Sequence, residues 1–217
     1  MKEHSSRKLL IWVRGLYLTA GYLNALTLLL FNETAVGQTG RMTNIVYYTF
    51  LSEWDMVIPL LLLSGSFLGG AILGGFIFPD NAFNQHSRIF GWTLILMGIG
   101  LTIFGEIPVL NPYLIYFVCV ILGIQNSLAV TYKGFSISSV VLTSVFSNFG
   151  VSVAKFIQGN KKAAQDAYYH GGNIINHIIG AILSILFFLQ DYDWMILFIS
   201  VIYIIMGVYY FKFNEEF

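Results

Sequence analysis

Six stretches of mostly apolar residues run through the chain, and each is long enough to cross a lipid bilayer. The hydrocarbon core of a bilayer is about 30 Å thick, and roughly 20 residues of α-helix span it. Because lipid offers no partners to backbone N–H and C=O groups, such stretches must be helical. We therefore predict an all-α polytopic membrane protein that forms a single membrane domain over residues 1–217. The predicted spans lie at about 9–31, 56–78, 88–107, 112–132, 170–190 and 194–212.

The composition supports a membrane as the solvent of this chain. Only 10% of the residues are charged and 57% are hydrophobic, whereas about 25% of the residues of a soluble domain are charged. The net charge is zero, which predicts no nucleic-acid partner. The expected partners are membrane lipids and an unknown small solute, and the sequence is also compatible with a homo-oligomer.

Lysine and arginine residues predict the orientation of the spans, because basic residues collect in the cytoplasmic loops of membrane proteins. With the N-terminus inside, nine basic residues fall on the cytoplasmic side and Arg41 alone falls outside. This predicts a multi-pass membrane protein with both termini in the cytoplasm. The nine residues are Lys2, Arg7, Lys8, Arg88, Lys133, Lys155, Lys161, Lys162 and Lys212.

Two connecting segments are too long and too apolar to be simple loops. Residues 39–51 follow the first span and residues 137–158 follow the fourth. Counting the second segment as a full span would place Lys212 outside, against the charge distribution. We therefore predict two additional half-helices that dip into the membrane or lie at its interface.

Three short motifs occur twice, in the same order. They are "GYLNAL" at 21–26 and "GIQNSL" at 123–128, "TGRMTN" at 39–44 and "TSVFSN" at 143–148, and "GAIL" at 70–73 and 180–183. The offset between the two copies is similar for all three motifs and increases slightly from the first motif to the third. We predict a 3+3 repeat, with repeat 1 at about 9–107 and repeat 2 at about 112–212. Since three is odd, the second copy enters the membrane from the opposite side, which makes an inverted repeat as in many secondary transporters.

These motifs resemble those of the YoaK-like family, bacterial integral membrane proteins that form a domain of unknown function. Members have a "GYxDA"-like motif in the first of six spans, a "TGN"-like element after it, and "GxQNA" in the fourth; the corresponding residues here are 21–25, 39–41 and 123–127. The resemblance implies the six-span fold, a location in the bacterial cytoplasmic (inner) membrane, and no particular substrate. The chain departs from the pattern at Asn24, which replaces an acid, at Arg41, and at Thr143-Ser144. The missing acid puts a proton-coupled role of position 24 in doubt.

The repeated motifs also predict a site. We expect Asn24 and Asn126 to face each other near the membrane midplane, where solute sites lie between inverted repeats. The two half-helices would begin there, so that their free N–H groups could meet an anion or a polar solute. The predicted substrate-binding residues are Asn24, Asn126, Tyr17, Tyr116, Thr39, Gly40, Thr143, Ser144, Asn173 and His177. The alternative is that the asparagines only form hydrogen bonds between helices.

No cofactor, metal or catalytic residue is predicted. His170 and His177 are seven residues apart, whereas two zinc ligands on one helix are usually four apart. The chain also has no G-x-S-x-G motif and no phosphate-binding loop. We predict a small-solute secondary transporter that works by alternating access, and not an enzyme. A non-transporting membrane scaffold or partner subunit is the main alternative, and a membrane-embedded enzyme is a weaker one.

Overall fold

The computed structural model of the protein describes residues 3–78, 88–128, 130–132, 135–137, 142–190 and 192–214. Over these ranges the chain is helical apart from one small antiparallel hairpin, so the prediction of a helical protein is confirmed. The elements are α1 (Glu3–Phe31), α2 (Gln38–Phe50), α3 (Trp54–Ile77), α4 (Ile89–Glu106), the 3-10 helix η1 (Asn111–Tyr113), α5 (Leu114–Ser127), β1 (Val130–Tyr132), β2 (Phe135–Ile137), α6 (Leu142–Ile157), α7 (Ala163–Gln190) and α8 (Tyr192–Asn214).

Five of these helices are long and apolar enough to cross a membrane, which is consistent with a polytopic membrane protein. They are α1, α3, α4, α7 and α8. The fourth predicted span, 112–132, is instead the shorter helix α5, which ends where Leu128 leaves helical geometry (φ −70°, ψ 75°). With η1 directly before it, this segment is about 27 Å long at a rise of about 1.5 Å per α-helical and 2.0 Å per 3-10 residue. Ala129, within the predicted span, lies outside the described residues.

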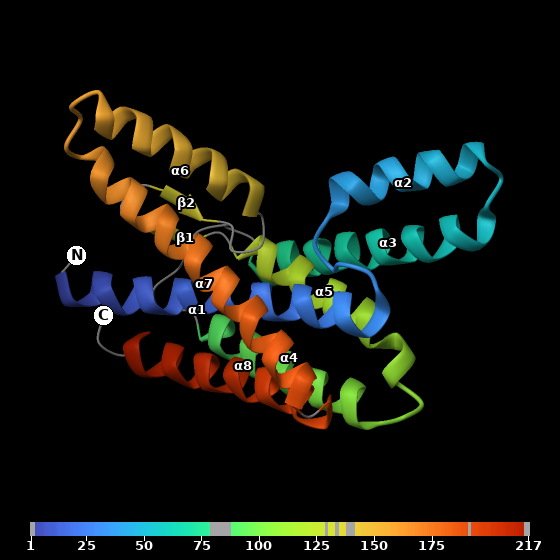
Figure 1. Ribbon diagram of the computed structural model, residues 1–217. Coiled ribbons are helices and arrows are strands. Elements are labelled where there is room, and N and C mark those ends of the chain that lie inside the picture. Colours follow the sequence, from blue (N-terminus) through green and yellow to red (C-terminus); the bar gives the residue numbers. More distant parts are fainter. Residues whose placement is uncertain are drawn as a thin grey trace.

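The helices α2 and α6 occupy the two segments for which half-helices were predicted. They contain 13 and 16 residues, so they are about 20 and 24 Å long and shorter than a membrane-spanning helix. Figure 1 shows that α2 folds back along α3, whereas α6 folds back along α7 in a different part of the molecule. The first residues of both short helices lie toward the centre of the fold, and their last residues lie toward its periphery.

Three helix pairs form the body of the protein: α1 with α7, α3 with α5, and α4 with α8. Glycines allow the first pair to approach, since a Cβ at Gly21 would collide with the backbone of His177, and one at Gly180 with that of Leu18. Arg14, earlier on α1, lies against Gly172, earlier on α7, so the two helices run in the same direction.

The other two pairs also meet at glycines. In the α3–α5 pair, a Cβ at Gly70 would collide with the backbone of Val120, and one at Gly123 with that of Phe67. In the α4–α8 pair, Gly91 lies against Gly207, and Gly98 lies against Ser200. In the α3–α5 pair, Gly74 lies against Ser127, so the residue numbers of the two helices rise together, whereas in the α4–α8 pair one falls as the other rises. Thus α3 and α5 are parallel, as α1 and α7 are, and α4 and α8 are antiparallel.

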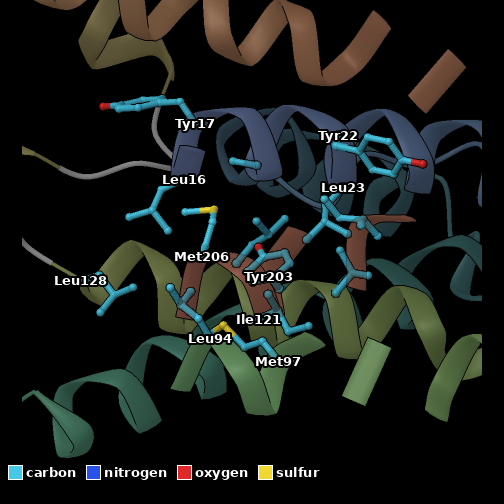
Figure 2. Packing of buried hydrophobic residues seen from close by; sticks show 14 of the residues in the cluster. Leu16, Tyr17, Tyr22, Leu23, Leu94, Met97, Ile121, Leu128, Tyr203 and Met206 are labelled. Atoms are coloured by element: carbon cyan, nitrogen blue, oxygen red, sulfur yellow. The ribbon is translucent and has the colours of Figure 1, made fainter. Parts of the chain in front are cut away.

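A polar network lies inside the hydrophobic core. The amide nitrogen Nε2 of Gln125 donates to the carbonyl oxygen of Leu16 at 2.8 Å, and the hydroxyl of Tyr203 donates to Oε1 of Gln125 at 2.6 Å. Figure 2 shows Tyr203 surrounded by apolar side chains of neighbouring helices. Because both side chains are fully buried, the two bonds satisfy groups that water cannot reach and connect α1, α5 and α8.

Candidate functional site

One cavity lies where the starts of α2 and α6 approach α1, α3, α5 and α7. Its volume is about 520 Å³. Both halves of the sequence contribute to its wall, in part through the asparagines and threonines of the repeated motifs. The lining residues are Asn24, Val36, Gly37, Gln38, Thr39, Gly40, Phe67, Asn126, Leu142, Thr143 and His177.

Side chains of α1 hold the turn that leads into α2. The side-chain oxygen Oδ1 of Asn24 accepts the backbone N–H of Val36 at 3.0 Å, and Oγ1 of Thr27 accepts that of Ala35 at 3.0 Å. The guanidinium of Arg41, in the first turn of α2, donates to the carbonyl oxygen of Thr34. These bonds determine where α2 begins, and they leave the amide nitrogen of Asn24, with two N–H donors, for a ligand in the cavity.

The beginning of α2 brings backbone donors to the cavity wall. The first backbone bond of this helix joins the N–H of Arg41 to the carbonyl oxygen of Gly37 at 2.9 Å. The N–H groups of Gln38, Thr39 and Gly40 precede that bond, so they have no partner within the helix. Gly37, which has no side chain, is the N-cap, so no side-chain hydrogen bond caps this helix. Helix starts of this kind attract anions and other hydrogen-bond acceptors.

The cavity wall is polar but almost without charge. Among the described lining residues there is no lysine, arginine, aspartate or glutamate, and His177 is the one titratable side chain. Its Nδ1 is buried and has no hydrogen-bond partner among the described residues, and the same is true of Nε2 of Gln38. Within the described ranges, no three histidine, cysteine, aspartate or glutamate side chains gather where they could hold one metal ion.

Six of the ten predicted site residues line this single cavity: Asn24, Asn126, Thr39, Gly40, Thr143 and His177. Tyr17, Tyr116, Ser144 and Asn173 are not among the lining residues. On α1, Tyr17 and Asn24 lie on either side of Gly21, where the backbone of α7 crosses. On α5, Tyr116 and Asn126 lie on either side of Gly123, where the backbone of α3 crosses. Each crossing closes the space between a tyrosine and its asparagine.

The remaining two residues are separated from the cavity in other ways. Ser144 and Thr143 are both exposed, but neighbouring side chains on a helix point about 100° apart, so Thr143 lines the cavity and Ser144 does not. Asn173 is fully buried on α7, four residues before His177.

Gln38, Phe67 and Arg41 were not predicted to belong to the site. Phe67 precedes His177 by the same offset that separates the two copies of "GAIL". The repeat could therefore have predicted Phe67 as a lining residue once His177 was proposed. Arg41 was assigned to the outer surface, but only 4% of its area is exposed. Its Nη1 lies 3.4 Å from Oε1 of Gln38, which lines the cavity. Burial of a guanidinium against local carbonyl groups cannot be read from residue spacing.

Comparison with known proteins identifies one match. The sequence model of a family described as "Protein of unknown function (DUF1275)" matches residues 13–209. No curated protein and no solved structure matches the chain.

Proposed function

The chain belongs to the family "Protein of unknown function (DUF1275)", and we propose that it is a small-solute secondary transporter that works by alternating access. On the motifs at 21–25 and 123–127 we further propose that it is a YoaK-like member of this family. The observation that carries the proposal is the cavity, in which Asn24 and Thr39 of one half meet Asn126 and Thr143 of the other. Inverted-repeat transporters bind solutes in such a place, between the repeats.

Helix contacts support the inverted repeat. Gly21 and Gly180 bring α1 and α7 together, and Gly123 and Gly70 bring α5 and α3 together. Alignment of the repeated motifs pairs Gly21 with Gly123 and Gly70 with Gly180. Each crossing is therefore formed by the glycine of the first motif from one half and the glycine of "GAIL" from the other half. In the second crossing the two halves have exchanged places. A two-fold axis between the repeats produces this exchange.

The α4–α8 pair follows the same rule. A Cβ at Gly91 would lie 2.9 Å from the carbonyl oxygen of Gly207, and one at Gly98 would lie 2.6 Å from that of Ser200. A single offset, one position shorter than that of the "GAIL" motif, relates Gly91 to Ser200 and Gly98 to Gly207. The two contacts therefore exchange under the proposed axis. The directions of the three helix pairs also agree with six alternating spans, in which α5 is the fourth. The first and fifth spans are parallel, the second and fourth are parallel, and the third and sixth are antiparallel.

The charge distribution supports a bacterial inner-membrane location with both termini in the cytoplasm. Arg41 was the one basic residue assigned to the outside, and it is buried. The bias toward the proposed cytoplasmic side is therefore stronger than residue counting indicated.

The donors at the cavity favour a solute that accepts hydrogen bonds. Oδ1 of Asn24 already accepts the N–H of Val36, which occupies one of the two lone pairs of this oxygen. The groups at the cavity include several N–H donors: the amide nitrogen of Asn24 and the first backbone groups of α2. We therefore propose a small polar or singly anionic solute bearing carbonyl, carboxylate or similar oxygen atoms.

Thiol accessibility tests the transport proposal without knowledge of the solute. In a Cys119→Ser background, Asn126→Cys is treated with a membrane-impermeant maleimide in right-side-out and inside-out vesicles. Alternating access requires modification from both sides, because each state opens the cavity to one side. Leu122→Cys is the control, since Leu122 lies one turn earlier on α5 and is fully buried; it should not react.

The scaffold alternative has one observation in its favour, the bond from the Val36 N–H to Asn24, which is a structural role for that amide. A scaffold would leave Asn126→Cys unreactive from at least one side. A melting-temperature screen of the purified protein against small polar metabolites then identifies the solute, because binding to the native state raises stability.

A further inference from the structure

Asn173 is a buried amide without partners. It is 0% exposed on α7, and neither its Nδ2 nor its Oδ1 forms a hydrogen bond with the residues that the structure describes. Buried polar side chains in native proteins are nearly always hydrogen-bonded, because an unpaired amide loses its bonds to water and gains nothing in return. A leucine would fill the position without this penalty. The presence of an amide therefore suggests that it forms hydrogen bonds in another conformation of the protein.

Its place in the helix connects Asn173 to the cavity. It lies one helical turn before His177 and on the same face of α7, and His177 lines the cavity with its buried Nδ1 unpaired. Toward the N-terminal end of α7, the guanidinium of Arg14 lies against Gly172 and 5.1 Å from the ring centre of Tyr168. Tyr168 is 67% exposed. Polar groups thus continue from the cavity along α7 to the surface.

In the opposite direction along α7, the next polar residue after His177 is Ser184. Ser184 is also fully buried, and its hydroxyl has no partner among the described residues. It is, however, two turns beyond His177, and Gly180 lies between them with the backbone of Leu18 directly against it. Asn173, one turn from His177, is the nearer of the two to the cavity wall.

The corresponding positions of α3 are apolar. The offset of the "GAIL" motif pairs His177 with Phe67 and Asn173 with Leu63. Phe67 lines the cavity opposite its polar counterpart, and Leu63 is 3% exposed. The proposed axis would make the two ends of the cavity alike, but these side chains make them different.

We infer that Asn173 is a second solute-contact position, reached when the cavity extends past His177 toward the N-terminal end of α7. In that state the amide binds the solute, or its water, as it moves toward Arg14 and the cytoplasmic side. On the route from the cavity to the outer side, the repeat-related positions on α3 are Phe67 and Leu63, which are apolar. This inference rests on the proposed transport function and adds a direction to it.

Cysteine accessibility tests the inference with a matched pair of variants. Asn173→Cys and Leu63→Cys are made in the Cys119→Ser background and treated with the impermeant maleimide from each side. Alternative states are typically populated at roughly 0.1–10%, so Asn173→Cys should react from the cytoplasmic side about 10 to 1,000 times more slowly than an exposed cysteine. Leu63→Cys should not react. Equal reactivity of the two variants, or no reaction of Asn173→Cys, overturns the inference.

A second variant separates this role from a structural one. Asn173→Leu removes the unpaired amide and should raise the apparent melting temperature of the purified protein; a lower melting temperature would show that the amide has a structural partner and would overturn the inference. Asn126→Cys distinguishes the two proposals. If it reacts from both sides while Asn173→Cys reacts from neither, only the Asn173 route fails. If Asn126→Cys reacts from neither side, the transport function fails, and this inference fails with it.

Discussion

Replacement of Gly180 by alanine tests the closest contact between α1 and α7. A Cβ at this position would lie 2.9 Å from the backbone nitrogen of Tyr22 and closer still to the carbonyl oxygen of Leu18, whereas ordinary contacts begin at 3.4 Å. The obstacle is backbone, which cannot rotate away as a side chain can, so the two helices must separate by at least about 0.5 Å.

The expected loss of stability follows from two opposing effects. Overpacking of a close contact typically costs about 1–3 kcal/mol, and a backbone obstacle places Gly180→Ala at or above the upper end. The better helix propensity of alanine offsets about 1 kcal/mol. The net loss of about 2 kcal/mol corresponds to a decrease of roughly 4–8 °C in melting temperature for a chain of this size.

Gly65→Ala is the matched control on α3. Nothing lies within 4 Å of a Cβ at Gly65, so only the helix propensity changes, and the melting temperature should stay the same or rise by about 2–4 °C. Both variants are measured in detergent by the temperature dependence of intrinsic fluorescence. A Gly180→Ala protein that melts within about 1 °C of the wild type would refute the contact argument. Gly123→Ala should lower the melting temperature as Gly180→Ala does, because a Cβ at Gly123 would also meet backbone atoms, here those of α3.

Two further predictions concern the core and the topology. Tyr203→Phe leaves Oε1 of buried Gln125 without its 2.6 Å donor, so the free energy of unfolding should fall by about 1–2 kcal/mol. When Tyr203→Phe is combined with Gln125→Leu, the two losses of stability should be less than additive. Strict additivity in denaturant titrations would contradict the bond. Reporter domains fused at Asn111 and Asn160 should lie outside and in the cytoplasm, respectively, and a cytoplasmic signal at Asn111 would exclude the six-span arrangement.

The spans were predictable because partitioning into lipid depends on local composition. A run of about twenty apolar residues prefers the bilayer whatever surrounds it, and five predicted spans correspond to long apolar helices. The fourth was less accurate, because α5 ends at Ser127 where the sequence remains apolar. Hydropathy cannot distinguish a continuing helix from the short hairpin that follows in residues 130–137.

The grouping of Asn24, Asn126, Thr39 and Thr143 was predictable for a different reason. Each residue belongs to a motif that occurs twice, and an axis relating two copies brings equivalent positions close together when they lie near it. The four residues line one cavity. Their role in binding a solute stays a prediction.

Only the tertiary structure decided which neighbours of these residues reach the cavity. Helical periodicity places Tyr17 and Asn24 on one face of α1, and Tyr116 and Asn126 on one face of α5. It does not specify the height at which another helix crosses. The backbones of α7 and α3 cross at Gly21 and Gly123, so the asparagines line the cavity while the tyrosines are excluded from it. Such a crossing depends on the close approach of segments that are far apart in the sequence, a relation that no local pattern contains.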